Sequence, residues 1–128
     1  MIGKKGGRGT MAAFELTPST LTLAFTGWER LGALRTDPVI PWADVADVEV
    51  VADPWAILAG LRVGTGLPWV ILLGTMLRAG GPDVVAVYRR APAVVVTLRP
   101  GARWQRLIAT VPDPEAEVAR IRAGLATC

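Results

Sequence analysis

The final third of the chain consists of short apolar runs, rich in β-branched residues and separated by tight connections. The runs span residues 84–90, 93–99 and 104–111, and they are joined by Ala91-Pro92 and by Pro100-Gly101-Ala102. Runs of this length bounded by Pro and Gly are typical of β-strands. Because connections of two or three residues usually join antiparallel neighbours, the pattern predicts an antiparallel meander in which each run pairs with the next.

Apolar and polar positions also alternate in the first half of the chain. Residues 21–25 carry apolar side chains at every second position, which is typical of a half-buried strand. A returning strand is predicted at 29–35, and a third strand at 44–51 is predicted to begin with a kink at Val45-Ala46. Residues 70–78 are almost all apolar, which predicts a strand that is covered on both faces.

The C-terminal segment carries the clearest helix signals. Asp113 is a natural N-cap, and Pro114 follows at the first helical position, where its missing N–H costs nothing. Gly124 is expected to end the helix. One apolar stripe runs along it, formed by Val118, Ile121 and Leu125. Together with the strands, this predicts a mainly β domain in which one C-terminal helix caps a closed or nearly closed barrel or sandwich.

Length and charge fit a single domain with a basic tail. The chain has 128 residues, with 14 Lys and Arg against 11 Asp and Glu. Lys4, Lys5 and Arg8 lie in a Gly-rich start, so we expect a disordered tail at 1–12 and one domain at 13–128. Without those three residues the charges balance at 11 against 11, which argues against a nucleic-acid partner.

Several residue types that commonly act in catalysis are absent from the chain or rare in it. The chain has no histidine, and its one cysteine is the last residue, Cys128. It therefore lacks the commonest general base and the commonest metal ligand, and it can form no internal disulfide. Past Lys5 there is no lysine to activate a serine. We therefore expect a non-catalytic protein without cofactor or metal. The lack of an internal disulfide fits a cytoplasmic location, which we expect. No apolar stretch reaches the roughly 20 residues of a membrane span.

Several short motifs together resemble those of a bacterial family of pleckstrin-homology-like (PH-like) domains of uncharacterised function. They are Ile40-Pro41-Trp42-Ala43-Asp44-Val45, Gly64-Thr65-Gly66-Leu67-Pro68, Gly74-Thr75, Pro92-Ala93-Val94-Val95-Val96 and Asp113-Pro114-Glu115. The resemblance covers residues 14–125 and implies a seven-stranded antiparallel barrel or sandwich with a C-terminal helix. In phosphoinositide-binding members of this superfold, a basic cluster surrounds the first hairpin loop. Here that loop is Thr26-Gly27-Trp28-Glu29-Arg30, with one cation beside one anion. The resemblance therefore favours protein binding or a scaffold role over lipid binding.

The apolar residues of one long connection are the candidate interaction surface. Residues 52–68 hold two prolines and three glycines and are expected to be irregular, and loops of this length are usually functional. One hypothesis is an exposed patch that binds a protein partner or a second copy, formed by Trp55, Ile57, Leu58, Trp69 and Trp28. The alternative is that these tryptophans close an open end of the barrel. A small-ligand cleft between this loop and the barrel, and contact of the basic tail with a membrane surface, are further alternatives.

Charged side chains supply two weaker candidates. An anion patch is a hypothesis for the arginines of the last three strands, Arg89, Arg99, Arg103 and Arg106. The alternative is that these arginines are ordinary solvated cations at strand ends. Successive side chains of a strand point to opposite faces, so the arginines need not share one face. Asp44, Asp47 and Glu49 form the densest acidic group, and we interpret them as a solvated face of the third strand.

Overall fold

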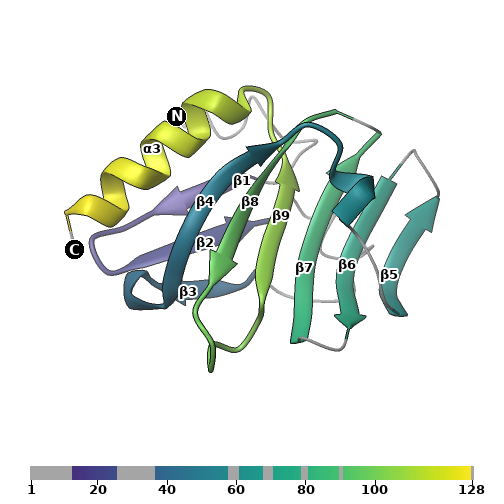
Figure 1. The fold of residues 1–128 in the computed structure, drawn as a ribbon, viewed down its shortest axis with the longest axis horizontal. Helices are drawn as coiled ribbons and strands as arrows, with labels where there is room; N and C mark the ends of the chain where they lie inside the picture. The colour runs from purple at the N-terminus through teal and green to yellow at the C-terminus, as the bar shows by residue number, and fades with distance from the viewer. Residues whose placement is uncertain are drawn as a thin grey trace.

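A computed structural model describes residues 13–25, 37–57, 61–67, 71–78, 81–89 and 91–127 (Figure 1). In these residues the chain is mainly β, with two sheets, two short 3-10 turns and one α-helix at the C-terminal end. The elements in chain order are β1 Ala13–Leu16, β2 Thr20–Ala24, β3 Val39–Pro41, η1 Trp42–Asp44, β4 Val45–Val51, η2 Pro54–Ile57, β5 Leu61–Leu67, β6 Ile71–Arg78, β7 Gly81–Tyr88, β8 Ala93–Leu98, β9 Arg106–Thr110 and α3 Pro114–Ala126. The predicted strand at 29–35 lies outside the described residues.

The smaller sheet has the order β1-β2-β3, and both of its pairs are antiparallel. A tight turn joins β1 to β2. The Oγ1 atom of Thr17 accepts a hydrogen bond from the backbone N–H of Thr20 at 2.9 Å, and the N–H of Thr17 donates to the carbonyl of Thr20 at the same distance. A threonine hydroxyl that bonds the backbone in this way stabilises a turn.

The larger sheet has the order β4-β8-β9-β7-β6-β5. The predicted meander is wrong here, because β7 and β8 are not neighbours. The last strand, β9, lies between them: it pairs antiparallel with β8 and parallel with β7. The connection at 89–92 therefore spans two strand spacings, about 10 Å, while the β8–β9 connection forms the hairpin.

The two sheets do not close into a barrel. In the described part of the chain, β4 and β5 are the edges of the larger sheet, and β1 and β3 are those of the smaller one. Figure 1 shows the larger sheet as an open, twisted layer that extends well beyond the smaller sheet toward β5. The prediction of a mainly β domain with a C-terminal helix is confirmed, and that of a closed barrel with seven strands is not.

The main hydrophobic core lies between the two sheets and α3. Both sheets contribute fully buried side chains to it, among them Leu21, Leu23, Val48, Val84, Val96 and Leu107. The helix adds Val118 and Ile121 and packs on β4, β8 and β1. The predicted N-cap is confirmed, because the Oδ1 atom of Asp113 accepts from the N–H of Ala116 at 3.2 Å. Gly124 does not end the helix, which continues to Ala126.

The predicted kink at the start of the third strand is a β-bulge. Val45 pairs with Leu98, but the next pair is Asp47 with Thr97, so Ala46 is an extra residue on β4. The bulge keeps both Val45 and Val48 buried, although three positions separate them. Asp47 and Glu49 are exposed, as predicted for a solvated face.

Two parts of the segment predicted to be irregular at 52–68 form regular secondary structure instead. They are the 3-10 turn η2 and the strand β5, which pairs with β6 at seven successive positions. The turn η2 lies over the outer face of the larger sheet. A second hydrophobic cluster lies there, formed by Met76, Val85, Val87, Ala93, Val95 and Ile108.

Among the described residues, no helix has the length and apolar character needed to cross a membrane.

Candidate functional site

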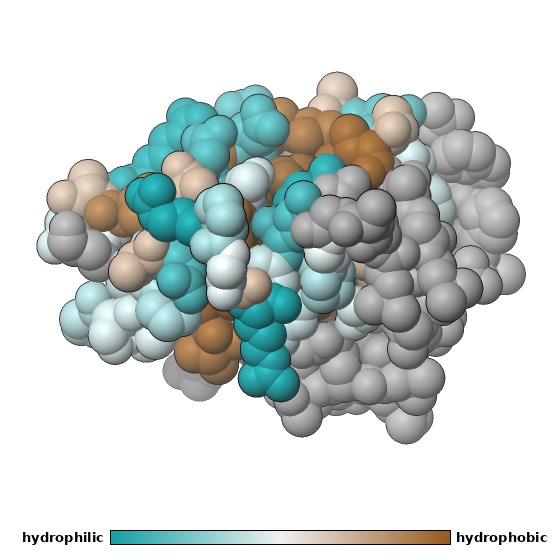
Figure 2. All heavy atoms as spheres, turned by 60° about the horizontal axis from the view of Figure 1, so that its bottom comes forward, coloured by the Kyte–Doolittle hydropathy of each residue, from teal (hydrophilic) through white to brown (hydrophobic). Residues whose placement is uncertain are grey.

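A hollow of about 390 Å³ lies beside the edge strand β3. One wall is formed by β3 and its flanking residues, and the other by the connection between β8 and β9. The lining residues are Asp37, Val39, Ile40, Pro41, Asp44, Arg103 and Trp104. Figure 2 shows the molecule from the side where the β8–β9 connection comes forward; among the coloured residues, hydrophilic ones prevail and hydrophobic ones gather in a few separate patches.

The hydrogen bonds of β3 decide which of its backbone groups face the hollow. The N–H of Leu23 donates to the carbonyl of Pro38 at 3.1 Å, and the N–H of Trp42 donates to the carbonyl of Ser19 at 3.3 Å. In an antiparallel ladder, hydrogen-bonded pairs alternate with pairs that are not bonded to each other. Val39, which stands opposite Thr22, therefore directs its N–H and its carbonyl away from β2. This outer edge of β3 borders the hollow.

Two prolines keep the open edge short. Pro38 precedes β3 and Pro41 ends it, and neither has an N–H to donate. The N–H of Val39 is therefore the principal donor along this edge. Its side chain is 54% exposed, which makes it the exposed large hydrophobic residue among those described. The edge thus offers one backbone donor, two carbonyls and an apolar side chain.

The opposite wall is a short, well-bonded hairpin connection. Gly101 adopts a φ of 92°, a conformation that favours glycine, and the N–H of Ala102 donates to the carbonyl of Arg99 at 3.1 Å. The guanidinium of Arg103 lies 5.2 Å from the ring centroid of Trp104, within the range of a cation–π contact. The wall therefore presents an indole with a cation stacked on it.

The charges around the hollow are mixed. Asp37 and Asp44 stand at the two ends of β3, and Oδ1 of Asp37 accepts a hydrogen bond from the N–H of Phe25 at 3.0 Å. Arg103 is the cation of the lining, and Arg99 lies close by, because its Nε donates to the carbonyl of Ala43 at 3.0 Å. The lining therefore carries two carboxylates and one guanidinium, with a second arginine nearby.

Two of the predicted interaction residues cover the larger sheet instead of forming an exposed patch. Trp55 and Ile57 belong to η2, are half-buried and pack against the second cluster. The indole N–H of Trp55 donates a hydrogen bond to the carbonyl of Arg89. Leu58, Trp69 and Trp28 lie outside the described residues.

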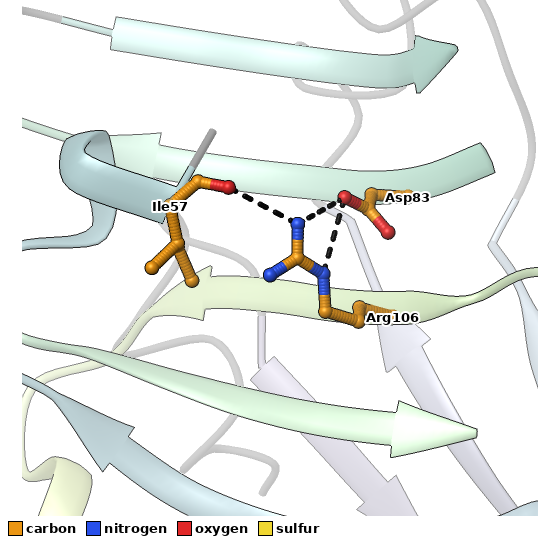
Figure 3. Close-up of polar contacts among 3 residues, drawn as sticks. All are labelled: Ile57, Asp83 and Arg106. Carbon is orange, nitrogen blue, oxygen red and sulfur yellow. Dashed lines mark hydrogen bonds and ion pairs between the residues drawn. The ribbon is translucent and has the colours of Figure 1, made fainter. Parts of the chain in front are cut away.

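Arg106, predicted as part of an anion patch, is committed to an internal ion pair (Figure 3). Its Nη2 lies 2.6 Å from Oδ2 of Asp83, and its Nε donates to the same oxygen at 3.2 Å. The same Nη2 donates to the carbonyl of Ile57 at 3.1 Å. Asp83 is fully buried and Arg106 is 14% exposed. The pair joins β7 to β9 at their register position and ties η2 to the sheet.

The other three arginines of that hypothesis lie at two different ends of the larger sheet. Arg89 follows β7 and Arg99 follows β8, and these strands run in opposite directions with β9 between them. Arg89 therefore lies at the end where β8 begins, whereas Arg99 and Arg103 lie at the other end, beside the hollow. The four arginines do not gather into one patch.

The hollow was missed by the sequence interpretation, although two signals point to it. The apolar pair Val39-Ile40 between Pro38 and Pro41 is too short to indicate a strand by itself, and the aromatic Trp104 lies far from it in the sequence. In the part of the chain that the structure describes, no three acidic or sulfur side chains come close enough to hold a metal ion.

Comparisons of the chain with protein-family models, curated proteins and solved structures find no match.

Proposed function

We propose that this protein is a non-catalytic binding module that holds an extended segment of a partner protein along the outer edge of β3. The observation that carries the proposal is the backbone of Val39, a residue that lines the hollow and whose N–H and carbonyl point away from β2. An extended segment that adds to an open strand gains main-chain hydrogen bonds, and adjacent side chains supply specificity.

The opposite wall supports the same mode of binding. A segment bonded to Val39 would lie between β3 and the stacked pair Arg103–Trp104. Aromatic residues and arginine are enriched where proteins bind each other, because they bury a large surface and keep a polar group for hydrogen bonding. The acids at the ends of β3 and the arginine opposite offer charged partners of both signs.

The shape of the hollow favours a polypeptide over a small molecule. Its volume of about 390 Å³ falls within the range of small-ligand pockets. Such pockets, however, usually enclose most of the ligand between apolar walls. Here Val39, Pro41 and Arg103 are exposed, so one side of any occupant would stay in water. A segment that continues beyond the hollow in both directions suits this open form.

The test uses peptides selected from a random library displayed on phage against the full chain. The variant Val39→Pro removes the outward N–H, while the hydrogen bonds between β2 and β3 do not use that group. One backbone hydrogen bond contributes about 0.5–1.5 kcal/mol, so we expect affinity to fall by about 2- to 12-fold by calorimetric titration.

Val39→Thr is the matched control, because it alters the same exposed side chain and keeps the N–H. We expect this variant to bind the selected peptides about as tightly as the wild type. Equal affinity of the Val39→Pro and Val39→Thr proteins would exclude main-chain pairing at β3. Peptides that still bind after Trp104→Ala with unchanged affinity would place their site elsewhere.

We also propose a PH-like relationship for this domain. It is supported by the mainly β architecture and by the C-terminal helix that packs against the sheets. The parallel pairing of β7 with β9 departs from the antiparallel arrangement that the resemblance implies.

A further inference from the structure

The C-terminal helix covers one edge of each sheet with an arginine. Nη2 of Arg122 donates to the carbonyl of Val48 on β4 at 2.8 Å, and Nη2 of Arg120 donates to the carbonyl of Phe14 on β1 at 2.8 Å. Exposed strand edges invite pairing with other chains, and proteins block them with charged side chains or covering elements. The edges β4 and β1 are blocked in this way.

The opposite edge of the larger sheet, β5, has no such cover among the described residues. It pairs with β6 at seven successive positions, from Leu61 with Leu77 to Leu67 with Ile71. None of the described strands pairs with its other side. Figure 1 shows β5 at the far end of the sheet from α3. Its sequence, LRVGTGL, contains a single charge and no proline, the two residue types that most often discourage edge pairing.

We propose that two copies of the chain associate edge to edge through β5, antiparallel, in the register that places Gly64 opposite Gly64 of the second copy. The sequence of β5 complements itself in this register. Leu61 stands opposite Leu67, Val63 opposite Thr65, and Arg62 opposite Gly66. In this register the sequence aligns apolar or β-branched positions with one another and its one charged position with a glycine. The two larger sheets become one continuous sheet across a two-fold axis.

Other registers are less favourable. Shifting by two residues shortens the seven-residue overlap, so main-chain hydrogen bonds are lost. A shift that centres the pair on residue 62 places Arg62 opposite Arg62, and like charges directly opposite each other destabilise a strand pair. This surface differs from the hollow beside β3, and the two proposals stand or fall separately.

The test compares two substitutions at one position by sedimentation velocity over a dilution series of the full chain. Gly66→Asp places a carboxylate opposite Arg62 of the second copy, and Gly66→Lys places a cation there. Each dimer contains this pair twice. We expect the dissociation constant of the dimer to fall about tenfold for Gly66→Asp and to rise about tenfold for Gly66→Lys. The double variant Arg62→Glu/Gly66→Lys restores opposite charges and is expected to associate again.

Ala46→Asp and Ala46→Lys are matched controls, because Ala46 is exposed on the covered edge strand β4. They are expected to leave association unchanged. A wild-type chain that sediments as a monomer at every concentration overturns the proposal, and so does a shift of the same sign for Gly66→Asp and Gly66→Lys.

If circular dichroism shows that the Gly66 variants are unfolded, the wild type alone decides. Its amides at 61–67 are then expected to exchange with deuterium more slowly as protein concentration rises. Exchange rates that do not depend on concentration overturn the proposal.

Discussion

The indole of Trp42 lies directly against the backbone of Gly124 on α3. A Cβ atom at position 124 would be 2.9 Å from Cη2 and 3.0 Å from Cζ2 of the indole, and 3.2 Å from Cδ2 of Leu16. Trp42 is 4% exposed, and its Nε1 donates to the carbonyl of Thr17 at 2.8 Å. The glycine inside the helix is therefore the residue that lets α3 approach the seam between β1 and η1.

Gly124→Ala is expected to destabilise the protein although alanine is the better helix former. The gain in helix propensity is about 1 kcal/mol, while overpacking a core contact costs about 1–3 kcal/mol. We expect a net loss of about 1 kcal/mol in the free energy of unfolding, measured by urea denaturation. In a Trp42→Phe background the two closest contacts are absent and only the one with Leu16 remains, so the same substitution is expected to cost less than in the wild type or to stabilise. A stabilising effect of Gly124→Ala in the wild type would contradict the close contact.

Breaking the ion pair between Asp83 and Arg106 is expected to be costly. Arg106→Met leaves the fully buried carboxylate of Asp83 without its arginine, and removing one member of a buried pair typically costs about 3–5 kcal/mol. Guanidinium denaturation measures the loss. The double variant Asp83→Leu/Arg106→Met removes both charges and is expected to recover at least about 2 kcal/mol of it. Equal stability of the single and double variants would show that the pair is not buried as described.

In the same Arg106→Met protein, the 3-10 turn η2 is expected to detach more often from the larger sheet. The carbonyl of Ile57 loses the guanidinium that holds it, and only part of the turn's side-chain surface is buried. We expect faster hydrogen exchange at residues 54–57 and unchanged exchange in α3. The variant Arg122→Met serves as a control, because that arginine bonds to β4 and not to η2.

Loss of the N-cap is expected to weaken α3. Asp113→Ala removes the carboxylate that accepts from the N–H of Ala116, and such a substitution costs about 1 kcal/mol. Asp113→Asn keeps an acceptor and is expected to retain most of the stability. Thermal denaturation followed at 222 nm compares the two variants. An unchanged melting temperature for Asp113→Ala would mean that packing of Val118 and Ile121 alone holds the helix.

The elements predicted correctly are those whose signal is local. These elements are the cap at Asp113, the apolar stripe of α3 and the kink at Val45-Ala46, which the structure shows as a bulge. Each depends only on residues that are near one another in the sequence. β5 was missed because its alternation, apolar at 61, 63 and 67, is masked by glycines at the intervening positions. Glycine is depleted in strands, so the segment was interpreted as a loop.

The order of strands was not accessible from the sequence. A short connection favours pairing of β7 with β8, yet β9 occupies the position between them. The ion pair of Asp83 with Arg106 contributes to this arrangement. The two residues are 23 positions apart, so no local sequence pattern predicts that they pair. The hollow could not be predicted from the sequence for the same reason. Its walls come from residues 37–44 and 103–104, which only the tertiary fold brings together.

The central place of β9 has a consequence for biosynthesis. A nascent chain that has emerged from the ribosome only as far as β8 lacks the strand that pairs with both β7 and β8. The two halves of the larger sheet are joined only when residues 106–110 arrive, shortly before α3 itself is complete. The larger sheet is therefore expected to stay incomplete until residues 106–110 are available, and chains that stop before them are expected to be substrates for proteolysis.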